Sequence, residues 1–393
     1  MSWEILKLKD VSNKIQYGYT ESAIIDESLP KFLRITDIVE SVVNWDTVPN
    51  CKIEPNELSK YILKKGDVVV ARTGNTTGYA KLINEDVNAV FASYLIRFQF
   101  NKELVVPEYI GKLIESNIFK SFVNQIKSGT AQGGANANTL SNFEFLCPPL
   151  PTQKRIASIL SNYDDLIENN LKRIKLLEET AQNIYKEWFV NFRFPNYENT
   201  PFNKETGLPI GWEMKKLSEL VYLTMGQSPE SEYYNINNEG LPFHQGVTGY
   251  GHRFVNHSTY CSKITRIAEE GDILFSVRAP VGRLNIAPDK LIIGRGLSAI
   301  KNKEGYQSFQ FYQLKNHFFQ EDMIGGGAIF NSVTKSDLEN QLLIYPMNNL
   351  IVNFEKIVKP IDGQIWKLNI QNQKLKVARD ILLPRLMNRT IEV

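Results

Sequence analysis

Apolar residues recur every three or four positions along two unusually long stretches of the chain. The first stretch runs from Thr152 to Val190, where Thr152 can cap a helix and Pro195 prevents its continuation. Such a stripe lies on one face of an α-helix, and a stripe this narrow and long is typical of a coiled-coil seam. The seam positions predicted in this stretch are Ile156, Ile159, Tyr163, Leu166, Asn170, Ile174, Leu177, Ala181, Ile184 and Trp188.

The second stretch shows the same spacing close to the end of the chain. Its predicted seam positions are Ile351, Phe354, Val358, Ile361, Ile365, Leu368, Asn372, Leu375, Ala378, Leu382 and Leu386. Long helices need a packing partner in water, and the simplest partner for each helix is the other one, in the antiparallel direction. Asn170 and Asn372 fall on the two seams, where a polar residue typically fixes the register. The alternative is that each helix packs only on its own domain.

The chain also repeats itself, and each copy ends in one of these helices. The segment WEILKLKDV, which begins at Trp3, resembles WEMKKLSEL, which begins at Trp212. The segment GDVVVARTG, which begins at Gly66, resembles GDILFSVRA, which begins at Gly271. One period covers nearly half of the chain, so the pattern indicates a duplicated domain plus helix and not a solenoid.

Each copy contains short alternating runs such as SYLIRFQF, which are bounded by Gly, Asn and Pro as strands and turns require. We therefore predict an α+β fold in which two similar mixed α/β domains are separated by two long antiparallel coiled-coil helices. The predicted globular domains are residues 1–150 and 196–346. The predicted helices are residues 151–195 in the centre and 347–393 at the C-terminal end.

The composition of the chain indicates the class of protein and the compartment in which it works. A chain of 393 residues is too long for one ordinary core, and a 42% hydrophobic, 22% charged composition is that of a soluble globular protein. The start of the chain lacks the pattern of a secretory signal, and no apolar run is long enough to span a bilayer. The three cysteines are widely spaced, which fits a reducing compartment. We expect a cytoplasmic protein without a membrane partner.

The sequence contains no recognisable catalytic motif. It has no G-x-x-x-x-G-K-[ST] phosphate loop, and its four histidines lack the spacing of metal ligands. The Gly-rich phrases SGTAQGGANAN and MIGGGAIFN are therefore interpreted as turns. We predict no catalytic residue, no metal site and no cofactor in this chain.

Three phrases resemble one family throughout the chain and in the right order. LEETAQNIYKEWFVNF, within Leu150–Phe192, resembles the central conserved helix of type I restriction–modification specificity subunits. KLKVARDILLPRLMNRTI resembles the C-terminal counterpart of that helix, and LPIGWEMKKLSEL resembles the entry to the second target-recognition domain. The helical motifs are fairly specific, whereas the recognition domains are only loosely patterned.

The resemblance implies a non-catalytic subunit whose two target-recognition domains each read one half of a split DNA sequence. It also implies that the helices fix the unread gap and dock two methyltransferase subunits, which use S-adenosylmethionine, while restriction subunits use ATP and Mg. The cofactors would therefore belong to partner subunits. The helix positions predicted to serve spacing and docking are Ile174, Leu177, Ile184, Trp188, Phe189, Leu375, Leu382 and Leu386.

Polar and basic residues in the predicted turns are the candidates for DNA contact. Arg matches guanine, Asn or Gln matches adenine, and Lys or Arg can anchor phosphates. In the first copy these candidates are Arg72, Thr73, Asn75, Thr77, Lys127, Ser128, Gln132, Asn136 and Asn138. In the second copy they are Gln227, Ser228, His244, Gln245, Tyr250, His252, Arg253, Arg278, Arg283, Asn331 and Lys335. For each residue alone, a solvated turn is the competing interpretation.

Two other functions stay open at this stage. A helix-spaced scaffold that binds proteins or another polymer would show no salt-sensitive DNA affinity, whereas a DNA-specificity subunit would. An enzyme in its own right is disfavoured by the missing motifs. Outside the two helices acidic residues slightly outnumber basic ones, so DNA binding would depend on local patches.

Overall fold

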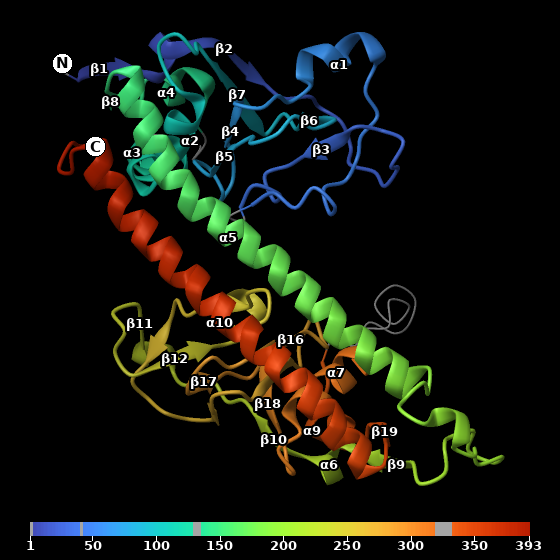
Figure 1. Ribbon diagram of the computed structural model, residues 1–393. Coiled ribbons are helices and arrows are strands. Elements are labelled where there is room, and N and C mark those ends of the chain that lie inside the picture. The colour runs from blue at the N-terminus through green and yellow to red at the C-terminus, as the bar shows by residue number, and fades with distance from the viewer. Residues whose placement is uncertain (1–2, 40–41, 129–134, 319–331) are drawn as a thin grey trace. The chain divides into compact units, whose positions relative to one another are not determined.

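The computed structural model describes residues 3–39, 42–128, 135–318 and 332–393. The chain divides into two compact units, which combine helices and strands (Figure 1). Unit 1 contains Met1–Arg173 and Leu368–Val393, and unit 2 contains Ile174–Lys367. Each unit therefore holds one sheet-bearing domain and a part of both long helices.

Unit 1 is built on a four-stranded antiparallel sheet in the order β2-β7-β4-β5. Its strands are β2 (Ser12–Tyr17), β4 (Val68–Ala71), β5 (Ala80–Leu82) and β7 (Leu95–Phe100). Two further pairs are β1 (Glu4–Lys7) with β8 (Glu144–Cys147), antiparallel, and β3 (Lys31–Leu33) with β6 (Ala89–Phe91), parallel. The short helices are η1 (Leu8–Val11), α1 (Pro55–Tyr61), α2 (Pro107–Glu115), α3 (Asn117–Ser128) and α4 (Ala137–Ser141).

Unit 2 repeats this plan, with a four-stranded sheet in the order β10-β18-β15-β16. Its strands are β10 (Val221–Met225), β15 (Ile273–Ser276), β16 (Leu284–Ile286) and β18 (Leu297–Asn302). A five-stranded sheet contains β11 (Tyr234–Asn235), β12 (Leu241–His244), β13 (Tyr260–Cys261), β14 (Ile267–Ala268) and β17 (Leu291–Ile293), and β9 (Glu213–Lys216) pairs with β19 (Leu342–Tyr345). The helices are η3 (Tyr197–Asn199), α6 (Leu217–Leu220), η4 (Ser231–Tyr233), η5 (Val247–Gly249), α7 (Gln307–Phe318) and α9 (Lys335–Glu339).

The alternating residues of β4 show why these strands form a two-sided sheet. Val68 and Val70 pack in one core together with residues of the long helices, whereas Val69 and Ala71 pack in a second core on the other face. β-branched residues suit a strand that is buried on both faces. In unit 2, Ile273 and Phe275 likewise face the helices while Leu274 faces the second core.

Hydrogen bonds show that the two copies correspond residue by residue. Asp67 accepts a hydrogen bond from the Lys64 backbone amide at 3.1 Å, and Asp272 accepts one from the Glu269 amide at 2.9 Å. The backbone carbonyl of Leu33 accepts from Ala92, as that of His244 accepts from Gly294. The duplication predicted from the sequence is confirmed by these contacts and by the shared strand order.

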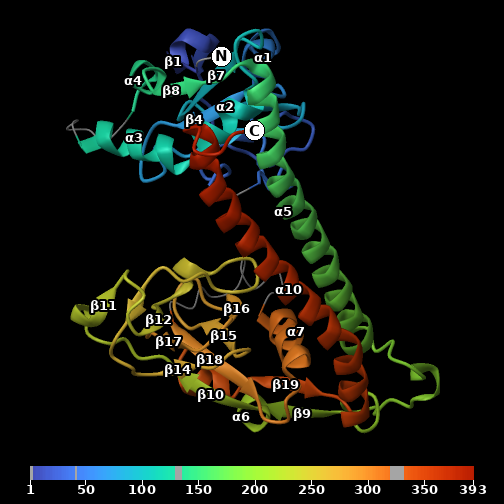
Figure 2. The ribbon, with the colours of Figure 1, turned by 60° about the vertical axis from the view of Figure 1, so that its left-hand side comes forward.

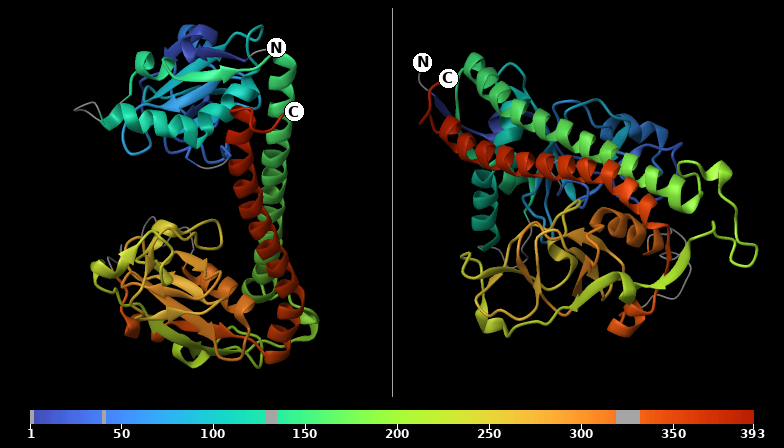
Figure 3. Two further views of the ribbon diagram at one scale, coloured as in Figure 1. Left: turned by 90° about the vertical axis from the view of Figure 1, so that its left-hand side faces the viewer. Right: turned by 60° about the horizontal axis from the view of Figure 1, so that its bottom comes forward.

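The long helices are α5 (Leu150–Tyr185), which a π-helical turn η2 (Lys186–Val190) continues, and α10 (Asn348–Met387). Within unit 1 they run antiparallel (Figure 2): the Asn170 side-chain amide donates to Asn372 Oδ1 at 2.9 Å, and Arg379 Nη1 donates to Asp164 Oδ1 at 2.6 Å. The prediction that Asn170 and Asn372 lie at the helix contact is confirmed. Within each unit, the parts of α5 and α10 that belong to it also lie side by side in the two views of Figure 3.

The predicted contact stripe is wrong at two positions. Leu166 is exposed, and the neighbouring Ile167 is buried instead. Ala378 is exposed, and Arg379 is only partly exposed. The apolar spacing alone misplaced the stripe, because charged residues also take part in the contact between the two helices. Asp164 of α5 and Arg379 of α10 contact each other there.

An aromatic cluster ends α5 inside unit 2. Phe189 is buried against Phe309 and Phe354, with ring centroids 5.1 and 5.3 Å apart, and Phe192 and Phe194 both contact Trp212. The corresponding end of α10 packs in unit 1 through Leu383, Leu386 and Met387. Of the helices within the described ranges, none combines the length and apolar character that a membrane span needs.

Candidate nucleic-acid interface

In each unit, several loops leave the four-stranded sheet at one end. In unit 1, Tyr17 at the end of β2 pairs with Ile96, and Ala71 at the end of β4 pairs with Leu95 at the start of β7. Antiparallel pairing therefore brings the loops after β2 and β4 next to the loop before β7. The same register recurs in unit 2, where Met225 of β10 pairs with Ser298 of β18. We call this edge the loop end of each sheet.

Arg72 holds the loop end of unit 1 together. Its Nε donates to the Ser93 carbonyl at 2.9 Å, and its guanidinium lies 5.1 Å from the ring centre of Tyr17. The Tyr17 hydroxyl in turn accepts a hydrogen bond from the Ala137 amide at 3.0 Å. The Arg72 carbonyl accepts from the Ala135 amide at 3.0 Å. Four chain segments therefore meet around this arginine, and Tyr17 is exposed beside it.

The residues predicted to contact DNA in the turn after Arg72 differ in their exposure to solvent. Asn75 is exposed and Thr73 is half-buried. Thr77 is buried, and its hydroxyl donates to the Gly74 carbonyl at 2.7 Å. The Thr77 hydroxyl therefore stabilises the turn, and a DNA contact at this residue stays a prediction.

The second predicted stretch of unit 1 lies around the end of α3 and the start of α4. Lys127 is half-buried near the end of α3, and Ser128 is the last residue of that helix. Gln132 lies outside the described residues. Asn136 caps α4 by accepting from the Thr139 amide at 2.9 Å, and Asn138 is exposed in the first turn.

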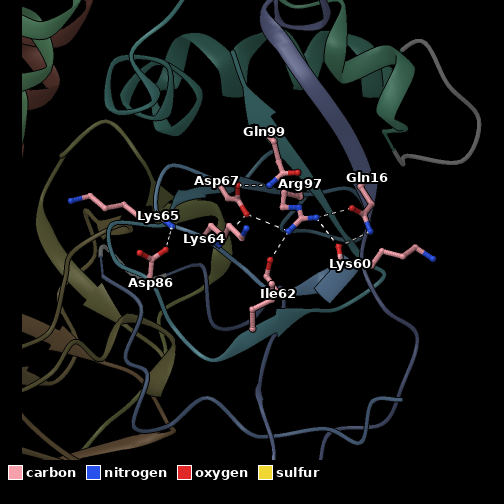
Figure 4. A network of polar contacts seen from close by, with 9 residues as sticks. All are labelled: Gln16, Lys60, Ile62, Lys64, Lys65, Asp67, Asp86, Arg97 and Gln99. Carbon is pink, nitrogen blue, oxygen red and sulfur yellow. Dashed lines mark hydrogen bonds and ion pairs between the residues drawn. The ribbon is translucent and has the colours of Figure 1, made fainter. Parts of the chain in front are cut away.

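A network around Arg97 supports β2 and the segment before β4 (Figure 4). Arg97 is buried; its Nη2 donates to Gln16 Oε1 at 2.7 Å, and its Nη1 donates to the Ile62 carbonyl at 2.7 Å. Its Nη1 also lies 3.3 Å from Asp67 Oδ2. Burial lowers the pKa of Arg97, and the Asp67 carboxylate opposes this shift. Because Gln16 precedes Tyr17, this network helps to place the exposed tyrosine.

In unit 2 the loop end presents a connected group of polar side chains. Ser228 donates to Gln245 Oε1 at 2.7 Å and accepts from the Arg295 amide at 3.1 Å. Gln245, Arg295 and Gln227 are exposed. The predicted residues Gln227, Ser228 and Gln245 are thus brought together by segments after β10, after β12 and between β17 and β18.

Sequence reasoning missed Arg295, which lies between Gly294 and Gly296. A Cβ atom on Gly296 would lie 2.4 Å from the Gln245 carbonyl oxygen, so only glycine fits at this position. The Gly-Arg-Gly phrase in IIGRGLS was the available signal, but it is too short to stand out among ordinary turns.

The correspondence of the copies also identifies Arg34 in unit 1. It follows Leu33 as Gln245 follows His244, and Leu33 and His244 are equivalent. Arg34 makes a two-point contact with Asp37, at 3.0 Å from Nε and 2.9 Å from Nη2. This hydrogen bonding raises the pKa of Arg34. A fixed, partly exposed guanidinium suits recognition of guanine.

The remaining basic candidates of unit 2 lie near the same loops. Arg278 and Arg283 are exposed in the connection from β15 to β16. Lys335 is exposed at the start of α9 and pairs with Glu339 at 3.3 Å. Asn331 lies outside the described residues.

Two residues of unit 2 that were predicted to contact DNA have buried side chains. His244 Nε2 lies 2.9 Å from His257 Nδ1, and burial, with the nearby His257, lowers the pKa of His244 to about 4. Arg253 donates to Asp362 at 2.6 Å and to the Tyr312 hydroxyl at 2.9 Å. Both side chains therefore stabilise the interior of unit 2.

Two neighbouring candidates lie at the margin of that interior. Tyr250 is half-buried, and burial raises the pKa of its hydroxyl. His252 is exposed, and its Nδ1 lies 3.4 Å from Glu178 Oε2.

The helix residues predicted to serve spacing and docking face inward. Ile174, Phe189 and Leu386 are buried, and the other five, Leu177, Ile184, Trp188, Leu375 and Leu382, are partly buried. They therefore pack within the units, and their role in spacing and docking stays a prediction. Among the large apolar residues that the helices present to solvent, Leu176, Val377 and Ile381 are the most exposed, at 62%, 59% and 52%, and Leu166, Ile357 and Val190 are also exposed.

Comparison with known proteins gives consistent similarity along the whole chain. Residues 1–179 and 209–373 match the family described as type I restriction modification DNA specificity domain. A protein of Methanocaldococcus jannaschii named "Putative type I restriction enzyme MjaX specificity subunit" is 33% identical, over 100% of this chain and 94% of that protein. The type I restriction enzyme HindI specificity subunit of Haemophilus influenzae is 23% identical, over 99% of both chains.

A solved structure has a similar fold. The crystal structure of a type I restriction–modification S subunit from M. genitalium matches with a TM-score of 0.54 and 15% identity, over 98% of this chain and 96% of that chain.

Proposed function

The chain belongs to the family of type I restriction–modification DNA specificity domains, and from this premise we propose how its two units divide the reading of DNA. The protein is the DNA sequence-specificity subunit of a type I restriction–modification complex and is not itself catalytic. The comparisons do not support the alternative of a helix-spaced two-domain scaffold that binds proteins or another polymer. Each unit is proposed to read one half of a two-part DNA target.

The observation that carries this proposal is the shared loop end of the two sheets. At the same end of equivalent sheets, unit 1 carries Arg72, Asn75 and Tyr17, and unit 2 carries Gln245 and Arg295. Arginine and amide side chains match the edges of guanine and adenine in the major groove. Exposed cations can also anchor phosphates and so offset the near-neutral charge of the whole chain.

The long helices are proposed to act as an antiparallel coiled-coil spacer that sets the unread gap. The antiparallel contact of Asn170 with Asn372 supports this role. At ~1.5 Å per residue, a helix over residues 152–190 would span about 58 Å. In this proposal residues 1–150 and 196–346 are the target-recognition domains, and 151–195 and 347–393 are the spacer helices.

Partner subunits are proposed to supply the chemistry. The complex would contain methyltransferase subunits, two in number, that use S-adenosylmethionine, and restriction subunits that use ATP and Mg. Docking on the helices is supported in unit 1 by the exposed apolar residues Val377 and Ile381 of α10, and in unit 2 by Leu176 of α5. The complex would act on DNA in the cytoplasm.

The decisive experiment is co-expression of this chain with a methyltransferase subunit, followed by mapping of N6-methyladenine in the host DNA. A two-part methylated motif that vanishes when this chain is omitted is expected. A purified complex without new methylation would contradict DNA reading by the recognition domains. Binding to DNA that does not weaken as salt rises would favour the scaffold alternative.

A further inference from the structure

Each long helix carries a half-buried aspartate at the same place in its copy. Asp164 of α5 follows Cys147, the last residue of β8, by as many positions as Asp362 of α10 follows Tyr345, the last residue of β19. These two strands pair in the same register with the first strand of their copy. The two aspartates are therefore equivalent, although their local sequences differ.

In unit 1, Asp164 joins the globular domain to both helices. Lys112 of α2 is buried, and its Nζ forms an ion pair with Asp164 Oδ2. Arg379 of α10 donates to Asp164 Oδ1 at 2.6 Å. Burial acts to lower the pKa of Lys112, but Glu115 and Asp164 outweigh it and raise the pKa, so the lysine stays charged. We call Lys112, Asp164 and Arg379 the Asp164 cluster.

In unit 2, Asp362 joins the globular domain to the long helices through different partners. Arg253, in the segment between η5 and β13, is only 4% exposed and donates to Asp362 Oδ1 at 2.6 Å. Its Nη1 donates to the Tyr312 hydroxyl of α7 at 2.9 Å and lies 3.7 Å from Glu178 Oε1 of α5. We call Arg253, Asp362, Glu178 and Tyr312 the Asp362 cluster.

The two clusters share one design, although their cations come from different elements. Each contains a buried cation from the globular domain, the equivalent aspartate of that copy's own helix and a charged residue of the other helix. Apolar contacts along helices are non-directional and tolerate small shifts. A buried, hydrogen-bonded ion pair has a narrow geometry, and separating its partners leaves an uncompensated charge.

From this recurrence we propose that the Asp164 and Asp362 clusters hold each recognition domain in one position on the helices and thereby determine which gap between half-sites the protein accepts. This inference rests on the proposed function. Lys112, Asp164, Arg253 and Asp362 are positioning residues: they act through the placement of the loop ends and do not contact DNA.

The test uses the full chain in complex with a methyltransferase subunit and S-adenosylmethionine. Methylation is measured on DNAs with both half-sites and with the gap at its natural length or changed by one or two base pairs. For Asp362→Asn, Asp164→Asn and Glu178→Gln, preference for the natural gap is expected to fall roughly tenfold to a hundredfold. The reason is that a misplacement of about 1 Å, caused by a mutation far from the reacting groups, can lower a rate about a hundredfold. The half-site sequences should stay unchanged.

Matched controls are Asp165→Asn and Glu179→Gln, which alter exposed acids next to Asp164 and Glu178 on the same helix. They are expected to keep the natural gap preference. Thermal unfolding is recorded for every variant, because loss of stability with an unchanged gap preference would show a merely structural role and overturn the inference.

Arg253→Lys covers the case in which an Asn variant does not fold. It keeps a charge opposite Asp362 but lacks the fork that also reaches Tyr312, so a smaller broadening of the gap preference is expected. An unchanged preference in this folded variant would also overturn the inference. If the wild-type complex itself methylates no two-part motif, the proposed function fails instead, so the two failures are distinguishable.

Discussion

At the scale of single residues, Arg295 shows how backbone geometry can present a side chain for recognition. Its amide donates to Ser228 Oγ at 3.1 Å, and Ser228 donates to Gln245. The flanking Gly294 and Gly296 approach the backbone of Gln245 too closely for a side chain. The turn is therefore rigid, and two exposed side chains are held next to each other.

Replacing Arg295 by Ala is expected to relax specificity at one position of one half-site. A two-point arginine contact with guanine contributes about 1–3 kcal/mol of discrimination against the wrong base. Competition binding at fixed salt, with each position of the target varied, measures this. Arg193→Ala, an exposed arginine that pairs with Glu187 outside the loop end, should leave the specificity profile unchanged. Equal weakening on all sequences would instead identify Arg295 as a phosphate contact.

A second residue-scale prediction concerns the exposed His252. Hydrogen bonding to Glu178 raises the pKa of His252, and burial opposes this shift. A group whose pKa is raised by folding stabilises the protein fully below its unfolded pKa of about 6.5, and this contribution is lost as pH rises through the folded pKa. The difference in unfolding free energy between wild type and His252→Gln should therefore shrink from pH 5.5 to pH 9.

Urea unfolding across this pH range provides the measurement. His317→Gln is the matched control, because His317 bonds to the uncharged Gln341 at 3.1 Å. A difference for His252→Gln that stays constant with pH would contradict a charged pair with Glu178.

At the scale of elements, the long helices combine apolar packing with polar contacts. Asn170 and Asn372 are buried and bonded to each other at 2.9 Å, and the Asn170 amide also lies 3.3 Å from Gln371 Oε1. Apolar residues alone would permit the helices to slide by a heptad, whereas a buried amide pair is satisfied in one register. The polar contact therefore favours a unique alignment at some cost in stability.

A double-mutant cycle on this pair tests that view. Asn170→Leu alone leaves the Asn372 side chain buried without its partner and should lower the free energy of unfolding by about 1–3 kcal/mol. Asn170→Leu combined with Asn372→Leu should be nearly neutral or stabilising, because both polar groups are removed. Urea unfolding measures the four states, with Asn169→Leu as the exposed control. Additive losses in the double variant would show that the amides do not interact.

At the scale of the whole molecule, the chain consists of two copies of one plan with different loop-end residues. Unit 1 has Arg34 where unit 2 has Gln245, because they follow the equivalent residues Leu33 and His244. Unit 1 has Arg72 where unit 2 has Val277, because their backbone amides donate to the equivalent carbonyls of Tyr94 and Gly296. The two units therefore share the arrangement of their strands but differ in the exposed side chains at the loop ends. Two equivalent domains can thus read unlike half-sites.

Independence of the two units gives a quantitative prediction. Arg34→Ala should relax one half-site and Arg295→Ala the other. Because the two residues belong to separate compact units, their losses of binding free energy should add within about 0.3–0.5 kcal/mol in the double variant. Competition binding on targets altered in either half provides the values. A clearly non-additive result, or relaxation of the same half-site by both variants, would contradict the two-part reading.

The repeat, the two helices and the mixed helix–strand class could be predicted from the sequence alone. These features depend on periodic patterns, such as the spacing from Ile351 to Leu386, and on segments that are repeated along the chain. Such patterns can be recognised without knowledge of tertiary contacts. Asn170 and Asn372 were identifiable for the same reason, since a lone amide in an apolar stripe is visible in sequence.

The division of polar residues between the interior and the surface became visible only in the folded chain. Arg253 and His244 look like surface residues in a polar stretch, yet Arg253 is buried because it meets Asp362, more than a hundred positions away. Arg34 and Arg295 were not predicted, because their place at the loop ends comes from the register between strands and from close backbone approach. Burial and ion pairing between distant segments have no local sequence period, and for that reason only the folded chain could reveal them.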